Sequence, residues 1–186
     1  PGSKMVDLAQ KFRFRKIFLN DPNLGGRYSA LSHFGMVPAT LIGIDSDRLL
    51  ERARVVASLC FPDRPVQQNP AAIFGAALGT LASLGRDKLT FIVPPDLNSF
   101  ADWAEQLIAE STGKHGKGIL PVVGEVPGDP EVYAQDRVFV HIYRENELQQ
   151  LDPLLKRRVS ALEASGHPII HIGLQALYDI GGQFLL

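Results

Sequence analysis

Apolar residues recur along the chain with two alternating periods, one typical of helices and one typical of buried strands. From residue 46 onward, short continuous apolar runs predict strands, and apolar residues every three or four positions predict helices. The expected strands are 89–93, 119–123, 138–143 and 168–172, and the expected helices are 46–60, 70–84, 99–109 and 151–164. Strands separated by helices indicate a parallel sheet covered on both faces. The pattern therefore predicts an α/β fold, a three-layer α/β/α sandwich with a mainly parallel sheet, whose ligands bind beyond the carboxyl ends of the strands.

The first 45 residues follow a less regular pattern. Ser3 is placed to cap a helix that runs to about Phe12, and the apolar run Ile17–Leu19 predicts a strand. A turn follows this run, and helical spacing resumes over residues 28–42. Pro38 lies inside that segment and is expected to kink the helix or divide it in two.

The segment 71–82 is apolar nearly all round, with Gly75 and Gly79 four residues apart. Asn69 and Pro70 are suited to begin this helix, and Gly85 is suited to end it. A membrane dimerisation helix would show similar glycine spacing, but the segment is too short to span a bilayer. A buried packing helix is therefore expected.

Composition narrows the class of protein. The chain has 186 residues, enough for one domain with a substantial core, and its formal net charge is −1. This charge gives no bias toward nucleic acid or an anionic membrane, and no stretch reaches the roughly 20 apolar residues that span a bilayer. Cys60 is the one cysteine. It is expected to be a small apolar core residue, and without a secretory-type start a reducing cytoplasm is expected.

Both ends of the chain look cut. It begins with Pro1-Gly2-Ser3 and stops in the apolar run Phe184–Leu186. The start fits either a cloning scar or a native fragment of a longer protein.

The turn Gly25-Gly26-Arg27 is the first candidate site. Paired glycines let the backbone take conformations closed to other residues. At the start of a helix, their N–H groups would point outward at the positive end of the helix dipole, and Arg27 adds a permanent cation. The turn predicts a site for an anion, or for negative charge that develops in a reaction. An ordinary tight turn with a surface arginine is the alternative.

Glu110 is the second candidate. At 100° per residue, Trp103, Leu107 and Glu110 share one apolar face of the expected helix, whereas Glu105 and Gln106 point toward solvent. A carboxylate at the end of a helix gains nothing from the dipole, so its place there needs an explanation.

The alternative for Glu110 is that the helix frays, and that the carboxylate turns to solvent or pairs with Lys114 or Lys117. The loop that carries these lysines is not a nucleotide P-loop, because the Gly-x4-Gly-Lys-Ser/Thr spacing is absent.

The five histidines favour structural roles. His141 and His171 lie in expected strands and are predicted to be hydrogen-bonded structural residues, and His115 is predicted to be a loop residue. No set of histidines approaches the spacing of metal ligands, so no metal is predicted. A Gly-x-Ser-x-Gly elbow and a Gly-x-Gly-x-x-Gly fingerprint are also missing.

Two motifs resemble glucose-6-phosphate isomerases. Gly25-Gly26-Arg27-Tyr28-Ser29 is similar to the Gly-Gly-Arg-Tyr/Phe-Ser signature of that family, and 110–114 is similar to its segment in which a Glu precedes Ser-x-Gly-Lys. Residues 18–23 and 41–45 look most like the isomerase half of bifunctional transaldolase/glucose-6-phosphate isomerases. The resemblance implies a fold of the SIS (sugar isomerase) type.

The resemblance also implies roles. Glu110 takes the place of the catalytic base, which moves a proton between C2 and C1 as glucose 6-phosphate and fructose 6-phosphate interconvert through a cis-enediol. Arg27 would stabilise negative charge on the enediol oxygen, together with substrate-binding Gly25 and Gly26, and Lys114 is also expected to bind substrate. No cofactor is implied. The expected partners are a sugar phosphate and a second copy in a homodimer.

The resemblance divides the chain into a segment 1–45, from the junction with a preceding SIS domain, and a second SIS-type domain, 46–186. The family's Ser/Thr-rich phosphate loop and ring-opening lysine are absent here, and its ring-opening histidine is unassigned. The chain alone is therefore expected to be inactive. A non-catalytic sugar-phosphate-binding or dimerisation module is one alternative, and a plain structural subdomain is another.

Overall fold

The sheet is the centre of the molecule. A computed structural model describes residues 3–186, so the expectations about Pro1 and Gly2 lie outside the described residues. Four strands pair in the order β2-β1-β3-β4, and every pair is parallel. The strands are β1 (Lys88–Ile92), β2 (Leu120–Val122), β3 (Arg137–Arg144) and β4 (Ile169–Leu174). All four predicted strands are confirmed.

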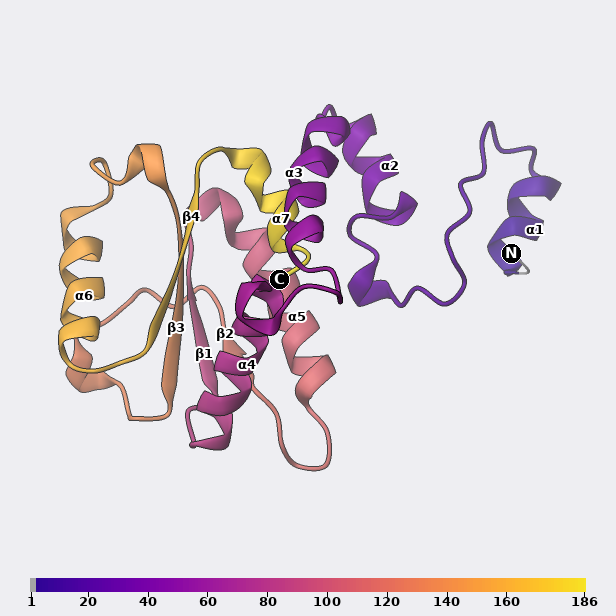
Figure 1. Cartoon of the computed structure of the whole chain (residues 1–186). Coiled ribbons are helices and arrows are strands. Elements are labelled where there is room, and N and C mark those ends of the chain that lie inside the picture. Colours follow the sequence, from indigo (N-terminus) through magenta and orange to yellow (C-terminus); the bar gives the residue numbers. More distant parts are fainter. Residues whose placement is uncertain (1–2) are drawn as a thin grey trace.

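Helices cover both faces of this sheet (Figure 1). On one face, α4 (Pro70–Ser83) and α5 (Asn98–Thr112) bury Leu78 and Ala104 against β1 and β3. On the other, α6 (Pro153–Ala164) packs Val159 and Leu162 onto Phe139 of β3. Alternate residues of β3 pack against the helices on opposite faces of the sheet, because successive side chains of a strand point in opposite directions. The three-layer α/β/α prediction is confirmed.

The remaining helices lie toward the α4 and α5 side (Figure 1). The amino-terminal part contains α1 (Lys4–Lys11), α2 (His33–Leu41) and α3 (Ser46–Leu59), and the carboxyl end forms α7 (Ile180–Gln183). Single 3-10 turns occur at Gly26–Tyr28, Val66–Gln68, Pro95–Leu97, Pro130–Val132, Glu145–Glu147 and Leu177–Asp179. A Cβ added to Gly181 would lie 2.3 Å from the Leu49 carbonyl oxygen, so glycine permits the close approach of α7 to α3.

Two predictions for the amino-terminal part are wrong. Residues Ile17–Leu19 form no strand, because no strand lies beside them to satisfy their backbone groups. The helix expected from Tyr28 begins at His33, where the Ser32 hydroxyl accepts a hydrogen bond from the Phe34 amide at 3.2 Å. A serine at this position caps a helix and so fixes its start.

Other details of the helix ends also differ from expectation. Helix α2 is not divided at Pro38, which lies inside it. Ser3 precedes α1, but its side chain makes no capping hydrogen bond. The expected ends of α4 are confirmed. Asn69 Oδ1 accepts from the Ala72 amide at 3.0 Å, and Gly85 takes a φ of +87° after the last turn.

Helix α4 is less buried than its composition predicted. Leu78 is its one buried residue, whereas Ile73 on its outer side is 49% exposed. One side of the helix packs on the sheet, and the other faces outward. Cys60 is partly buried. Within residues 3–186, no helix combines the length and hydrophobicity needed to cross a membrane.

Candidate active site

Arg27 and Glu110, 83 residues apart in sequence, form an ion pair between Nη1 and Oε2. Arg27 lies in the 3-10 turn Gly26–Tyr28, and Glu110 lies in the last turn of α5, which continues to Thr112. The helix therefore does not fray before Glu110. The carboxylate side chain is 47% exposed. Glu110 thus extends outward at the helix end instead of lying buried on the apolar face.

The second oxygen of this carboxylate is also bound. The Gln106 amide donates to Glu110 Oε1 at 3.0 Å, one turn earlier on α5. The sequence pattern placed Gln106 on the solvent side of the helix, and the residue is exposed, but its hydrogen bond to Glu110 was not predicted. Hydrogen bonds from Gln106 and then Arg27 lower the pKa of Glu110 below its ordinary value of 4.5, since both favour the charged form. Glu110 is therefore an ionised carboxylate at neutral pH.

Two further contacts hold the turn against α5. The indole N–H of Trp103 donates to the Arg27 carbonyl oxygen at 3.2 Å. The hydroxyls of Tyr28 and Ser111 lie 3.3 Å apart. These contacts hold the turn without using the Arg27 guanidinium, which pairs with the Glu110 carboxylate.

A cavity of about 340 Å³ opens beside the ion pair, lined by Gly26, Arg27, Phe34, Trp103, Gln106 and Glu110. A Cβ built on Gly26 would have no atom within 4 Å, so this glycine leaves space where a side chain would project. Arg27 Nε is buried and has no hydrogen-bond partner among residues 3–186. A buried donor without an acceptor is costly, and an oxygen-rich ligand would satisfy it.

The glycines do not act as the sequence predicted. Gly25 has a φ of −69°, and Gly26 is not among the residues with positive φ. They begin a single 3-10 turn and not the helix α2, so they do not lie at the positive end of an α-helix. Within residues 3–186, neither amide donates a hydrogen bond. Both N–H groups are therefore available to a ligand.

Lys114 lies next to the site without pairing with the carboxylate. Its Nζ donates to the backbone carbonyl of Glu110 at 2.7 Å, where a cation binds the unpaired end of a helix. Its backbone pairs with that of Lys117 around the tip of the loop. The alternative in which Glu110 pairs with either lysine is thus wrong. His115 lies in this loop, as predicted, with a φ of 53°.

The α/β pattern favoured a site at the carboxyl edge of the sheet. The ion pair lies away from that edge. Helix α5 starts at that edge, just after β1, and Glu110 is twelve residues beyond its first residue, Asn98. At 1.5 Å per residue, this is about 18 Å along the helix. The candidate site therefore belongs to the opposite end of α5.

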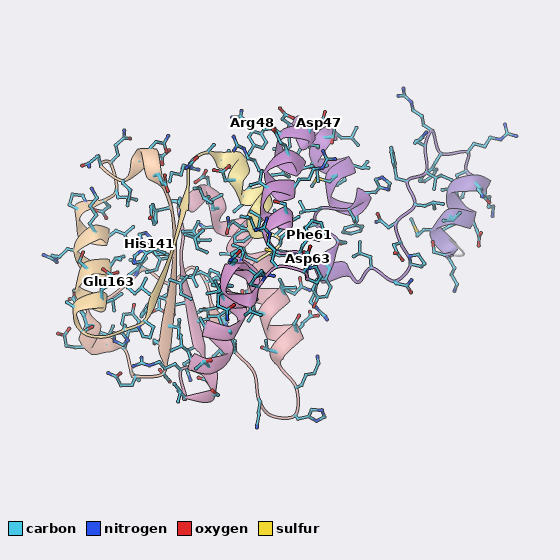
Figure 2. The ribbon with its side chains drawn as sticks, viewed as in Figure 1. Asp47, Arg48, Phe61, Asp63, His141 and Glu163 are labelled. Atoms are coloured by element: carbon cyan, nitrogen blue, oxygen red, sulfur yellow. The ribbon has the colours of Figure 1, made fainter. Side chains whose placement is uncertain are left out.

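The two strand histidines differ from each other. His171 Nε2 lies 2.7 Å from Glu163 Oε1, which confirms that His171 is hydrogen-bonded. His141 lies between β3 and α6, near Glu163 (Figure 2), but its buried Nδ1 has no partner within residues 3–186. The prediction of a hydrogen-bonded His141 is wrong for this atom. In the part of the chain described, no three His, Cys, Asp or Glu residues gather in a way that could hold a metal.

Similarity to known proteins was found over 60–73% of the chain, depending on the relative. It is 34% identical over 113 residues to the glucose-6-phosphate isomerase of Symbiobacterium thermophilum, covering 60% of this chain and 25% of that protein. It is 32% identical over 123 residues to that of Methanocaldococcus jannaschii, and over 139 residues to that of Carboxydothermus hydrogenoformans. These matches cover 66% and 73% of this chain, and 30% of each relative. No protein-family model matches the chain. The chain is thus a distant homologue of part of these isomerases, spanning 25–30% of their length.

Proposed function

We propose that this chain contributes one part of a glucose-6-phosphate isomerase active site. The single observation that carries the proposal is the Arg27–Glu110 ion pair, which joins the two motifs across 83 residues. The matched relatives, all named glucose-6-phosphate isomerases, support the same reaction.

In this proposal Glu110 is the base. Its carboxylate takes the proton from C2 of the open-chain sugar phosphate and returns it to C1, and a cis-enediol lies between the two transfers. A positioned base of this kind contributes roughly 10²–10⁴-fold to the rate. The lowered pKa keeps Glu110 ionised and ready to accept a proton.

In the reaction, Arg27 interacts with the substrate as well as with Glu110. Negative charge that develops on the enediol oxygen attracts the guanidinium, and the unpaired Arg27 Nε and the amides of Gly25 and Gly26 supply further donors. Fixed donors aimed at developing charge lower the barrier because they need no reorganisation. Lys114 adds positive charge beside the cavity and binds the substrate. No cofactor takes part.

We propose that residues 1–45 and 46–186 are two functional units, the first from a junction with a preceding SIS domain and the second an SIS-type domain. The rest of the site, including the phosphate loop and a lysine for ring opening, lies in other parts of the working enzyme. We also place the enzyme in a reducing cytoplasm, as a homodimer. A fusion to transaldolase is supported here only by the likeness of 18–23 and 41–45, since the matched relatives are named as isomerases alone.

The test is a matched pair of substitutions in the complete enzyme. Glu110→Gln keeps the shape of the side chain and removes the base, so kcat should fall by roughly 10²–10⁴ with little change in stability. Glu105→Gln makes the same chemical change on the same helix, at a residue with no ion pair or side-chain hydrogen bond within residues 3–186. It should leave kcat nearly unchanged. Equal losses at both positions would refute the assignment.

The chain alone provides a second test. The phosphate group of the substrate must give up hydrogen bonds to water when it binds. Without the phosphate loop and lysine, few protein donors replace these bonds, so binding of glucose 6-phosphate should be weak. A coupled assay should detect no isomerase activity. Turnover within the usual enzyme range of about 1–10³ per second would contradict the proposed partial site.

A further inference from the structure

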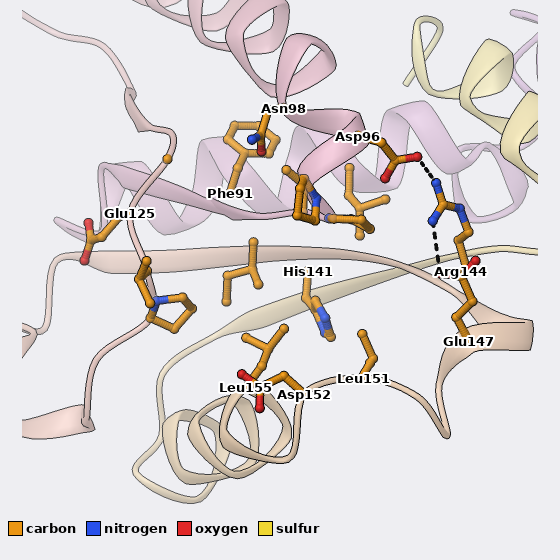
Figure 3. A pocket seen from close by; sticks show the side chains of 18 of the residues that line it. Phe91, Asp96, Asn98, Glu125, His141, Arg144, Glu147, Leu151, Asp152 and Leu155 are labelled. Atoms are coloured by element: carbon orange, nitrogen blue, oxygen red, sulfur yellow. Dashed lines mark hydrogen bonds and ion pairs between the residues drawn. The ribbon is translucent and has the colours of Figure 1, made fainter.

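A larger cavity lies at the other end of α5. It has a volume of about 520 Å³ and opens where β1 and β3 end, between residues 93–98, 124–127 and 147–155 (Figure 3). The chain leaves β1 toward β2 on one side and leaves β3 toward β4 on the other. The two connections diverge at this point, and in parallel sheets such divergence leaves a crevice in which ligands bind.

The walls of this cavity are largely apolar. Phe91, Ile142, Val126, Leu151 and Leu155 contribute to its lining. An apolar lining with a few polar groups is typical of sites for small organic molecules. A ligand here therefore needs an apolar body.

The charged groups of the lining are mostly acidic. Four carboxylates (Asp96, Glu125, Glu147 and Asp152) face one guanidinium, that of Arg144. Arg144 is already paired with Asp96 and, at 3.0 Å, with Glu147. Glu125 is paired at 3.0 Å with Arg137, which does not itself line the cavity. Even with Arg137 included, carboxylates exceed guanidinium groups by four to two, so the cavity favours positive charge.

His141 is the second, independent sign of a ligand. Its ring projects from β3 among the lining side chains (Figure 3), and the residue is only 6% exposed. Its Nδ1 has no hydrogen-bond partner within residues 3–186, although buried polar groups in folded proteins are nearly always paired. Burial lowers the pKa of His141 to about 4, with a smaller contribution from His171, so the ring adds no positive charge at neutral pH. A neutral imidazole can accept a hydrogen bond from an ammonium group.

We propose that this cavity is a binding site for a small organic cation, an amine with an apolar body. The ammonium group lies among the carboxylates and the apolar body lies against Phe91 and Leu155. This site is about 18 Å along α5 from Glu110. It does not depend on the proposed isomerase function.

Three probes of similar size test the proposal on this chain. They are phenethylamine, 2-phenylethanol and phenylacetate, which share a benzyl body and carry a positive, zero or negative charge. Phenethylamine should bind saturably, with a dissociation constant in about the millimolar range expected of so small a ligand. Backbone amide NMR signals of Asn98, Gly124 and Val126 should shift, and those of Gly26 and Arg27 should not. The alcohol should bind more weakly, and the anion weakest.

A charge-removing variant provides the second arm. Glu147→Gln removes one lining carboxylate and should weaken phenethylamine binding about three- to tenfold, the effect of one partly exposed charge. Glu51→Gln makes the same change on the surface of α3, outside the cavity, and should change binding little. Phenylacetate binding as tightly as phenethylamine would overturn the proposal. So would an absence of saturable amine binding, shifts confined to Gly26 and Arg27, or equal effects of the two variants.

Discussion

Gln106 and Glu110 lie one turn apart on α5 and are joined by a hydrogen bond of 3.0 Å between the amide and Oε1. This contact is the largest cause of the lowered pKa of Glu110, ahead of Arg27. The electrostatic state of the candidate base is thus set first by its own helix and second by the Gly-Gly-Arg turn.

Replacing Gln106 by Leu should therefore raise the pKa of Glu110. The leucine keeps the helix propensity and removes the donor to the charged form. The pKa can be followed by NMR titration of the Glu110 side-chain carbon. The Arg27 pair remains in this variant and still favours the charged form, so the pKa should rise but stay below the ordinary value of 4.5. An unchanged titration curve would mean that the hydrogen bond does not persist in solution.

Gly26 and Gly35 offer a matched pair of glycine substitutions. Alanine at Gly26 would meet no atom within 4 Å, so stability should change by less than about 0.5 kcal/mol. Alanine at Gly35 would place its Cβ 2.0 Å from the Ala30 carbonyl oxygen and should destabilise the chain by roughly 1–3 kcal/mol. Urea unfolding measures both.

Gly26→Ala also distinguishes an effect on ligand binding from an effect on stability. If Gly26 leaves room for a sugar phosphate, Gly26→Ala should raise the KM of the complete enzyme while its unfolding midpoint stays unchanged. A variant with normal KM would show that the open space beside Gly26 is not used by the substrate.

The pH dependence of stability should reflect His141. Its pKa is about 4 in the folded chain and near 6.5 when the ring is exposed on unfolding. Between these values the unfolded state binds the additional proton, so stability is greatest above pH 6.5 and falls as the pH drops toward 4. The slope contributed by one such group reaches about 1.4 kcal/mol per pH unit.

Urea unfolding at several pH values measures this slope. The variant His141→Phe cannot bind a proton and should lose it, whereas His115→Asn, in the exposed loop, should keep it. The asparagine tolerates the positive φ of position 115. Parallel curves for the unmodified chain and His141→Phe would contradict the assignment.

Lys114 and Lys117 provide a test of substrate binding. Lys114→Met should raise the KM of the complete enzyme, because its positive charge lies beside Glu110. The loss of its bond to the helix end should cost only about 0.3–1 kcal/mol of stability. Lys117→Met, which shares the loop but makes no side-chain contact with Glu110, should change KM less. Equal changes would assign both lysines to a general electrostatic effect.

The sheet and its covering helices were predictable because they depend on local hydrophobic period. The runs at 89–93 and 138–143 carry enough buried apolar residues to form strands wherever a partner is present. Residues Ile17–Leu19 show the same pattern, yet they form no strand since partner strands are not encoded locally. Period alone cannot distinguish these cases.

The site was predictable in its residues and less so in its geometry. Arg27 and Glu110 were identified by motif, and the structure brings them together. Gln106 was missed because a helical wheel records the direction of a residue from the core but not its contacts. Its position four residues before Glu110 was the available signal, since such residues are neighbours on a helix surface. The cavity beyond β1 and β3 depends on three separate loops and has no signature in any one of them.

The hydrogen bond from the Trp103 indole to the Arg27 carbonyl has a practical consequence. Trp103 is the one tryptophan of the chain, so the intrinsic fluorescence of this protein excited near the red edge of its absorption arises from a single fluorophore. That fluorophore touches the backbone of the Gly-Gly-Arg turn and lines the cavity beside Glu110. Its emission wavelength and quenching therefore report whether the turn is docked on α5, without any added label.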